Sequence, residues 1–109
     1  MDISVRQQDE TAIVEVTGDI DLYSSPQVRQ TILDTLNQKA ANRVIVNLAG
    51  VKYIDSSGVA SLVEGLKKAR ERNLRFILFG LSNAAREVLE LSRLIKVFEV
   101  YATEEEALK

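Results

Sequence analysis

Hydrophobic residues recur with two different periods along the chain, and the first period is that of a β-strand. Segments 3–5 and 11–17 alternate apolar with polar positions on either side of a polar break at 8–10. Alternation on both sides of a short polar turn is typical of an antiparallel hairpin. The sequence therefore predicts such a hairpin at the start of the chain, ended by Gly18.

After this hairpin, segments with helical spacing alternate with short apolar runs. The runs are rich in branched residues, which is typical of strands covered on both faces. The first helix is predicted to begin at Ser24-Ser25-Pro26, with serine as the cap and proline at the first helical position. The other predicted helices are 59–69, 84–91 and a short one that starts at 103–106, and the predicted strands are 44–48, 76–79 and 97–101.

The resulting order, β, β, α, β, α, β, α, β, α, predicts an α/β fold. Strands joined by helices require crossover connections, and these produce a mainly parallel sheet with helical cover. We therefore expect a mixed sheet of five strands, antiparallel in the N-terminal hairpin and otherwise largely parallel, with about four helices. The length of 109 residues fits a single domain, 1–109.

Composition narrows the possible functions. The chain has no cysteine and no histidine, so it lacks thiolate ligands and the commonest general base and metal ligand. A net charge of −2 argues against binding to nucleic acid. No apolar run approaches the roughly 20 residues that span a bilayer, and no signal peptide is visible. We predict a cytoplasmic protein that is not an enzyme, holds no metal or cofactor, and does not insert into a membrane.

The segment 51–59 carries the most informative chemistry, because it lies between a buried strand and the start of the second long helix. Free backbone N–H groups and the positive end of the helix dipole favour an anion at such a position. A serine here has two possible roles: it caps the helix, which is the commoner one, or it accepts a phosphate. A phosphate-binding P-loop is not indicated, because the required lysine is absent and only one glycine is present.

Within this segment, Asp55-Ser56-Ser57-Gly58 resembles the signature of bacterial anti-sigma factor antagonists, which are small STAS-domain proteins. The segment from Gly18 to Pro26 resembles the glycine, acid, hydrophobic, aspartate pattern that this family carries between its second strand and first helix. The similarity extends over essentially the whole chain, including the pattern around Leu91-Ser92-Arg93-Leu94. The chain is therefore similar to a single STAS domain.

This resemblance implies a partner-switching mechanism. An unphosphorylated antagonist binds an anti-sigma factor that is also a serine kinase, and thereby frees a sigma factor. The kinase then phosphorylates the first serine after the motif aspartate, which corresponds to Ser56. A metal-dependent serine phosphatase resets the protein, and ATP and magnesium belong to the kinase. The protein is thus a substrate, and it needs no base of its own.

The resemblance also suggests roles for the neighbours of Ser56. Ser57 is the competing phosphate acceptor, because it has the same chemistry one residue away. Asp55 is expected to cap the helix or brace the loop rather than act as a base. Gly58 is expected to let the partner's backbone approach closely.

Further partner-binding candidates lie on and near the upstream segment. Asp21 corresponds to the family aspartate on the neighbouring loop, placed to contact the kinase or its nucleotide; equally, it is a turn aspartate that bonds its own backbone. Tyr23, Tyr53 and Val59 are candidates for an exposed apolar rim around the serine, and each is also a candidate for the core.

One departure from the antagonist pattern supports an alternative function. Val59 is followed by Ala60, where many antagonists have glycine, and alanine favours helix continuation. This feature resembles stand-alone STAS subunits of lipid-transport ABC systems, which bind an ATPase subunit and need no phosphorylation. An enzyme is the least favoured class, because Asp21 and Asp55 are the only suggestive acids and a carboxylate pair does not define a reaction.

Overall fold

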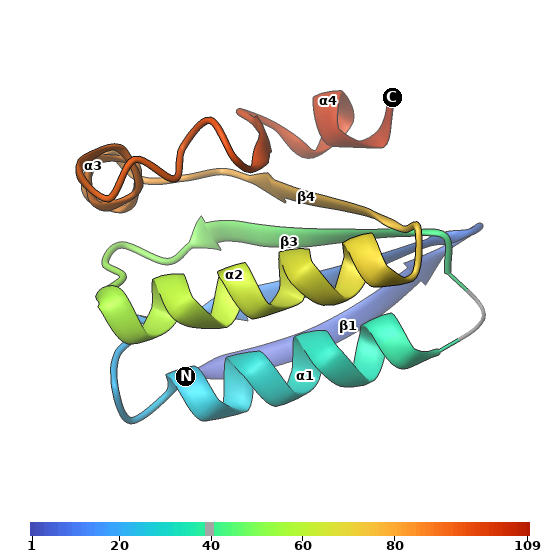
Figure 1. Cartoon of the computed structure of the whole chain (residues 1–109), viewed down its shortest axis with the longest axis horizontal. Coiled ribbons are helices and arrows are strands. Elements are labelled where there is room, and N and C mark those ends of the chain that lie inside the picture. The colour runs from blue at the N-terminus through green and yellow to red at the C-terminus, as the bar shows by residue number, and fades with distance from the viewer. Residues whose placement is uncertain (39–40) are drawn as a thin grey trace.

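The computed structural model describes residues 1–38 and 41–109, which form one five-stranded sheet with helices on both of its faces (Figure 1). The strand order follows the sequence, from β1 at one edge to β5 at the other. The strands are β1 (Asp2–Gln8), β2 (Thr11–Thr17), β3 (Arg43–Gly50), β4 (Arg75–Phe79) and β5 (Glu99–Tyr101), and the helices of the described residues are α1 (Ser25–Asn37), α2 (Ser56–Glu71), α3 (Asn83–Leu91) and α4 (Glu104–Leu108).

The pairing confirms the mixed α/β sheet that the sequence predicts. β1 and β2 pair antiparallel without a break in register, from Asp2 opposite Thr17 to Gln8 opposite Thr11. The other three pairs, β2 with β3, β3 with β4 and β4 with β5, are parallel. Each parallel pair is joined through one helix, as a crossover requires.

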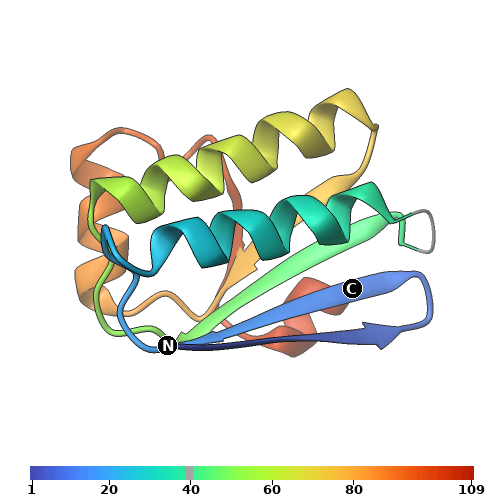
Figure 2. The ribbon, with the colours of Figure 1, turned by 90° about the horizontal axis from the view of Figure 1, so that it is seen from below.

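Two hydrophobic cores lie on opposite faces of the sheet. α1 and α2 lie side by side over one face, where Ile32 and Leu62 pack against alternate residues of the strands such as Val46 (Figure 2). The opposite face carries Ile45 and its neighbours in a smaller cluster, covered by α4 through Ala107 and Leu108. The central strands are therefore buried on both sides, which explains their continuous apolar runs.

Among the boundaries that differ from the sequence prediction, two have a cause that the hydrogen bonds show. α1 begins at Ser25 with Ser24 as its N-cap residue, so Pro26 occupies the second helical position. The Ser24 hydroxyl makes no capping bond, because it donates to the Asp19 carbonyl and accepts from the Asp21 amide.

The last strand is also shorter than predicted, with bounds Glu99–Tyr101 instead of 97–101. The Val97 amide donates to the Leu94 carbonyl in a turn and is therefore not available to a strand ladder. Phe98 is buried, and its ring packs against Phe76 with a centroid separation of 6.5 Å. The apolar character of Phe98 therefore reflects burial and not strand pairing, and Val97, which is exposed, lies in the turn.

The carboxyl ends of β2 and β3 bring the two motif segments together. The chain leaves β2 into the loop before α1, and it leaves β3 into the loop before α2; both helices therefore begin at the same end of the molecule (Figure 1). Crevices beyond the carboxyl ends of strands are the usual place for function in open α/β sheets.

Candidate functional site

The two motif loops are joined along their length by backbone hydrogen bonds. The Gly18 amide donates to the Gly50 carbonyl at 3.0 Å. Further along, Ile20 and Ile54 form a parallel bridge, in which the Asp55 amide donates to the Ile20 carbonyl at 3.1 Å. The aspartate segment and the serine segment therefore form one surface.

Asp55 caps α2, as expected. Its backbone is extended, and its carboxylate oxygen Oδ1 accepts from the Ser57 amide at 2.9 Å and the Gly58 amide at 3.2 Å. The hydrogen bond from the Ser57 hydroxyl lowers the pKa of Asp55 most strongly; burial opposes this, and the backbone amides of Gly58, Ser57 and Leu22 assist it. Asp55 is therefore held as an anion, in the role of a structural cap.

The two adjacent serines differ in what their hydroxyls do. Ser57 is half-buried, and its Oγ donates to Asp55 Oδ1 at 2.5 Å. Ser56 is exposed at the first position of α2, and its hydroxyl bonds to no residue of the described chain, 1–38 and 41–109. Only the Ser56 hydroxyl is therefore both free and accessible to an incoming group.

Gly58 is required by internal packing. A Cβ at this position would lie 2.5 Å from Ile54 Cγ1 and 2.7 Å from Ile20 Cγ2, both buried side chains of the paired loops. The role of Gly58 therefore differs from the expected one, which was to let a partner's backbone approach. The glycine is buried, and its missing side chain leaves space for the protein's own core. Val59 is also only 6% exposed, which places it in the core and not on an exposed rim.

Asp21 braces its own turn. Its Oδ1 accepts from the Tyr23 amide at 3.0 Å and the Ser24 amide at 3.1 Å, as well as from the Ser24 hydroxyl at 3.2 Å. Its carbonyl also accepts from the Ser25 amide at the start of α1. This arrangement matches the interpretation of Asp21 as a turn aspartate, and it shapes the loop that lies against the Ser56 segment.

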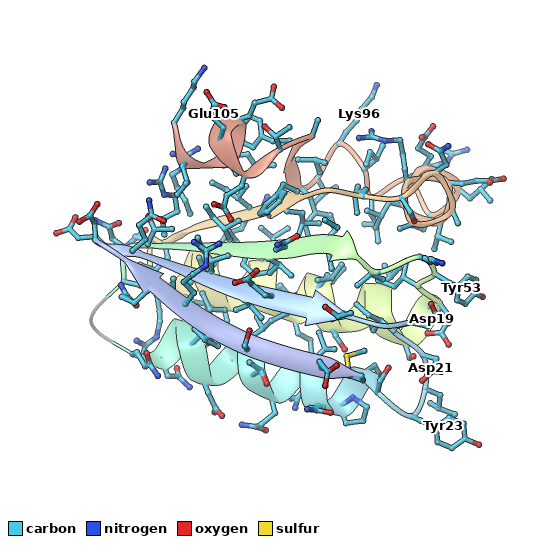
Figure 3. All side chains as sticks on the ribbon, turned by 180° about the vertical axis from the view of Figure 1, so that it is seen from behind. Asp19, Asp21, Tyr23, Tyr53, Lys96 and Glu105 are labelled. Atoms are coloured by element: carbon cyan, nitrogen blue, oxygen red, sulfur yellow. The ribbon has the colours of Figure 1, made fainter. Side chains whose placement is uncertain are left out.

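Apolar and aromatic side chains project from these braced loops. Tyr23 is 92% exposed, Leu22 69% and Tyr53 50%. Figure 3 shows Tyr23 and Tyr53 at the same end of the molecule as Asp19 and Asp21, with Tyr23 extending furthest from the ribbon. Exposed aromatic groups next to a polar centre are typical of protein contact sites.

Two buried or half-buried hydroxyls hold the helices to this surface. The Ser61 hydroxyl shares its one proton between the Ser57 carbonyl in α2 and the Ser25 carbonyl in α1, at 3.1 and 3.2 Å. The Ser82 hydroxyl, which caps α3, donates to the Lys52 carbonyl at 2.8 Å. The Ser56 segment is therefore tied by hydrogen bonds to α1 and α3 as well as to its own helix, α2.

A shallow depression also lies on this surface. Asp19, Asp21, Tyr23 and Ser24 line an open depression beside α1. Within residues 1–38 and 41–109, no three carboxylate, histidine or cysteine groups are placed to hold a metal ion. In the same residues, no helix is both long enough and apolar enough to cross a membrane.

Leu22, Asp19 and the supporting hydroxyls of Ser61 and Ser82 were not identified as site residues from the sequence. Leu22 stands inside the upstream motif, but periodicity does not separate an exposed leucine of a loop from a core leucine. Ser61 and Ser82 gave a weaker signal, since a serine facing an apolar helix side or preceding a helix suits a buried bond or a cap equally well.

Comparison with known proteins agrees with this geometry. A family model of the STAS domain matches residues 2–107. The anti-sigma-B factor antagonist of Listeria monocytogenes is 30% identical over 105 residues, which make up 95% of this chain and 91% of that protein.

Solved structures agree as well. An anti-sigma factor antagonist from Mycobacterium paratuberculosis matches with a TM-score of 0.89 at 25% identity, covering 98% of this chain and 90% of the other. The phosphorylated form of the Bacillus cell fate determinant SpoIIAA matches with a TM-score of 0.75 at 28% identity, covering 98% and 96%. The chain therefore belongs to the STAS domain family and is similar to bacterial anti-sigma factor antagonists.

Proposed function

We propose that this STAS-domain protein is an anti-sigma factor antagonist whose binding is switched off by phosphorylation of Ser56. In the unphosphorylated state it binds an anti-sigma factor that is also a serine kinase, and thereby frees the sigma factor. The observation that carries the proposal is the free, exposed hydroxyl of Ser56, in a loop that is hydrogen-bonded to the loop carrying the exposed Leu22 and Tyr23.

Ser56 is the acceptor because its neighbour is engaged. In the transfer, the Ser56 oxygen bonds to the γ-phosphorus of the kinase's ATP, ADP leaves, and the hydroxyl proton passes to the kinase. Ser57 would have to break its 2.5 Å bond to Asp55 before its oxygen could react. That bond stabilises the carboxylate, so its loss would carry a free-energy cost that Ser56 avoids.

The phosphate would act by changing the charge of the surface. The amides of Ser57 and Gly58 already donate to the Asp55 side chain, and that of Val59 donates to the Asp55 carbonyl. Few helix N–H groups therefore remain to fold the phosphate back onto the protein. A group of about −1.5 to −2 charges would stay under the partner, close to the carboxylate of Asp55.

Such a charge is tolerated by the fold and not by the complex. An anion at the start of α2 interacts favourably with the helix dipole. Under a bound partner, in contrast, an unpaired dianion carries a large desolvation cost. The phosphorylated protein therefore releases the kinase, and removal of the phosphate by a metal-dependent serine phosphatase restores binding.

The test is a phosphorylation and binding series with the cognate kinase. Wild type and Ser57→Ala should each take up one phosphate, located on Ser56 by peptide mass spectrometry, and Ser56→Ala should take up none. Calorimetry with ADP or ATP present should show persistent binding of Ser56→Ala and weak binding of Ser56→Glu. Because Ser56 makes no capping bond, Ser56→Ala should keep its stability and serve as a folded control.

Two outcomes would contradict the proposal. Phosphate on Ser57 alone would assign the switch to the wrong serine. Equal affinity of wild type, Ser56→Ala and Ser56→Glu would remove the partner switch, and tight binding of all three to a transporter ATPase would favour the ABC-system alternative.

A further inference from the structure

β1 forms a long open edge of the sheet. It contributes seven residues at one margin, whereas β5 at the other margin contributes three (Figure 2). In an edge strand, alternate residues point their N–H and C=O groups away from the sheet. Apart from the ladder with β2, no backbone group of residues 2–8 bonds elsewhere within the described chain.

This edge lacks most of the usual features that prevent strand pairing, and its only charged residues are Asp2 and Arg6. Natural edge strands are protected by proline, lysine, bulges or an overlying segment. β1 contains no proline, lysine or glycine, and its register with β2 is continuous. Its one basic residue, Arg6, is turned along the sheet to pair with Glu15 and Glu104.

We propose that β1 pairs antiparallel with β1 of a second copy of this chain, with Ser4 facing Ser4 of the second copy across a two-fold axis. In this register Asp2 lies opposite Arg6 of the second copy, and Ile3 lies opposite its Val5. The charged pair occurs twice by symmetry, on the sheet face that carries α4. The β-branched pairs lie on the face that carries α1, where Ile3 packs against the core.

Charge and side-chain direction select this register. A two-fold axis normal to the sheet keeps the helices of both copies on the same side. Even-numbered residues of one β1 then lie opposite even-numbered residues of the other, and odd-numbered opposite odd-numbered. Centring the pair on Val5 places Asp2 opposite Gln8 and leaves both charges without a partner. Centring it on Arg6 brings two guanidinium groups together. Centring on Ser4 pairs each charge with its opposite.

Arg6 retains the capacity for the additional pair. Its guanidinium has five N–H groups. Three hydrogen bonds are present within the chain, to Glu15, Gln8 and Glu104. The bonds to Glu15 of β2 and Glu104 of α4 turn the guanidinium away from the open edge, so in the dimer one of its remaining N–H groups must reach Asp2 of the second copy from that position.

The occupant is a second copy because the edge matches itself. A strand of another protein would meet the same backbone groups. To match the side chains as well, it would have to place a base opposite Asp2, a branched residue opposite Ile3 and Val5, a small residue opposite Ser4 and an acid opposite Arg6. β1 reads Asp2-Ile3-Ser4-Val5-Arg6, which is complementary to its own reversal. This inference does not depend on the proposed partner switch, since β1 contributes neither Ser56 nor the exposed loop residues.

The first test is sedimentation equilibrium over a range of concentrations. Wild type should show a monomer–dimer equilibrium. Asp2→Lys should weaken it by about tenfold, because two opposite-charge pairs become like-charge pairs. Circular dichroism should show that the exposed Asp2→Lys variant stays folded. A monomeric wild type at all concentrations, or unchanged association of Asp2→Lys, would overturn the proposal.

A second experiment tests the register directly. Ser4→Lys and Ser4→Glu should each weaken self-association by about fivefold, because like charges then meet on the axis. An equimolar mixture of the two variants should recover it as a heterodimer. Ala84→Lys and Ala84→Glu, at an exposed position of α3, are matched controls that should leave association unchanged. Failure of the mixture to recover association, with both variants folded, would overturn the Ser4 register.

Discussion

The two loops at the functional end use the same local device and present different chemistry. In each loop an aspartate accepts hydrogen bonds from the amides two and three residues further on. Asp21 does so with Tyr23 and Ser24, and Asp55 does so with Ser57 and Gly58. Each carboxylate also accepts from a serine hydroxyl, that of Ser24 or Ser57.

The difference lies in the residues directly after each aspartate. Asp55 is itself the N-cap of α2, so the next residue, Ser56, begins the helix with its hydroxyl exposed. Asp21 precedes a turn, and α1 begins only at Ser25. The residues of that turn, Leu22 and Tyr23, project their side chains outward.

The contrast indicates a division of labour between the loops. One braced loop presents the free hydroxyl of Ser56 at a helix start, and the other presents the exposed side chains of Leu22 and Tyr23; in the proposed function these are the phosphate acceptor and the contact area. Because the loops are bonded to each other through Ile20, Tyr53 and Asp55, a charge added to one lies beside the contact surface of the other. Substitutions in the two loops test this division, and their expected effects on the free energy of unfolding range from large to negligible.

The largest effect is expected where the two loops pack together. Gly58→Ala places a Cβ against Ile54 and Ile20, and overpacking of this kind costs about 1–3 kcal/mol. This loss outweighs the helix preference of alanine. Urea denaturation should therefore show a lower midpoint for Gly58→Ala. Ala60→Gly, at an exposed position of the same helix, is the control that changes helix propensity without touching the loops. A Gly58→Ala variant as stable as wild type would show that the loops are not closely packed.

The next effect separates the two aspartates. Asp55→Ala removes a helix cap and should cost about 1 kcal/mol, whereas Asp21→Ala removes a turn brace and should cost about 0.5 kcal/mol. The loss is smaller at Asp21 because the Ser24 hydroxyl keeps the Asp19 carbonyl as an acceptor, whereas Asp55→Ala removes the carboxylate that caps α2 and accepts the 2.5 Å bond from Ser57. Thermal and urea unfolding of both variants would measure the difference. Equal losses would contradict the distinction between cap and brace.

Much of the architecture was predictable from local pattern. The hairpin, the parallel strands and the first three helices follow from apolar periodicity, because burial on one or two faces leaves a different spacing in each element, and the short last helix follows from the acids after Thr103. The start of α1 was displaced by one residue, since Ser24, Ser25 and Pro26 all suit a helix start. The predicted start of the last strand is wrong at Val97 and Phe98: Val97 is exposed and lies in a turn, and Phe98 is apolar because it is buried against Phe76.

The site was predictable in position and not in detail. The sequence places two equivalent serines after Asp55, and only the structure shows which hydroxyl the carboxylate takes. The sequence also does not show why position 58 must be glycine. One of the two side chains that exclude a Cβ there is that of Ile20, which is far away in the sequence. Contacts between segments remote in sequence leave no local signature, so such roles require the fold.

A pH dependence should result from the lowered pKa of Asp55. A carboxyl group whose pKa is lower in the folded state stabilises the protein above its unfolded pKa, and this contribution is lost as pH falls through the folded pKa. Wild type should therefore lose the advantage it holds over Asp55→Asn on acidification below about pH 4. Urea unfolding of both proteins at a series of decreasing pH values should show the difference between their free energies of unfolding becoming smaller.

The Ser57 hydroxyl is the largest cause of this lowered pKa, so Ser57→Ala should raise the pKa of Asp55 towards its ordinary range. Titration of the carboxyl carbon by NMR would measure it. Glu99, whose pKa is lowered chiefly by Arg75, lies away from the loops and provides an internal reference that Ser57→Ala should not shift. An unchanged pKa of Asp55 in Ser57→Ala would contradict the arrangement at the cap.

The smallest effect on folding is expected at the tip of the other loop. Tyr23 is almost fully exposed, so Tyr23→Ser should change the free energy of unfolding by less than about 0.5 kcal/mol. In the proposed function, Tyr23 lies on the surface that contacts the kinase. Its truncation to serine should therefore weaken binding of the kinase by about tenfold, as truncation of an aromatic contact commonly does. Leu91→Ser is the matched control, because Leu91 is also largely exposed but lies at the end of α3. Calorimetry against the kinase should separate the two variants, with Leu91→Ser binding like wild type. Equal affinity of Tyr23→Ser and wild type would remove the contact role from this loop, whereas a loss of affinity with unchanged stability would show that its braced turn serves the complex and not the fold.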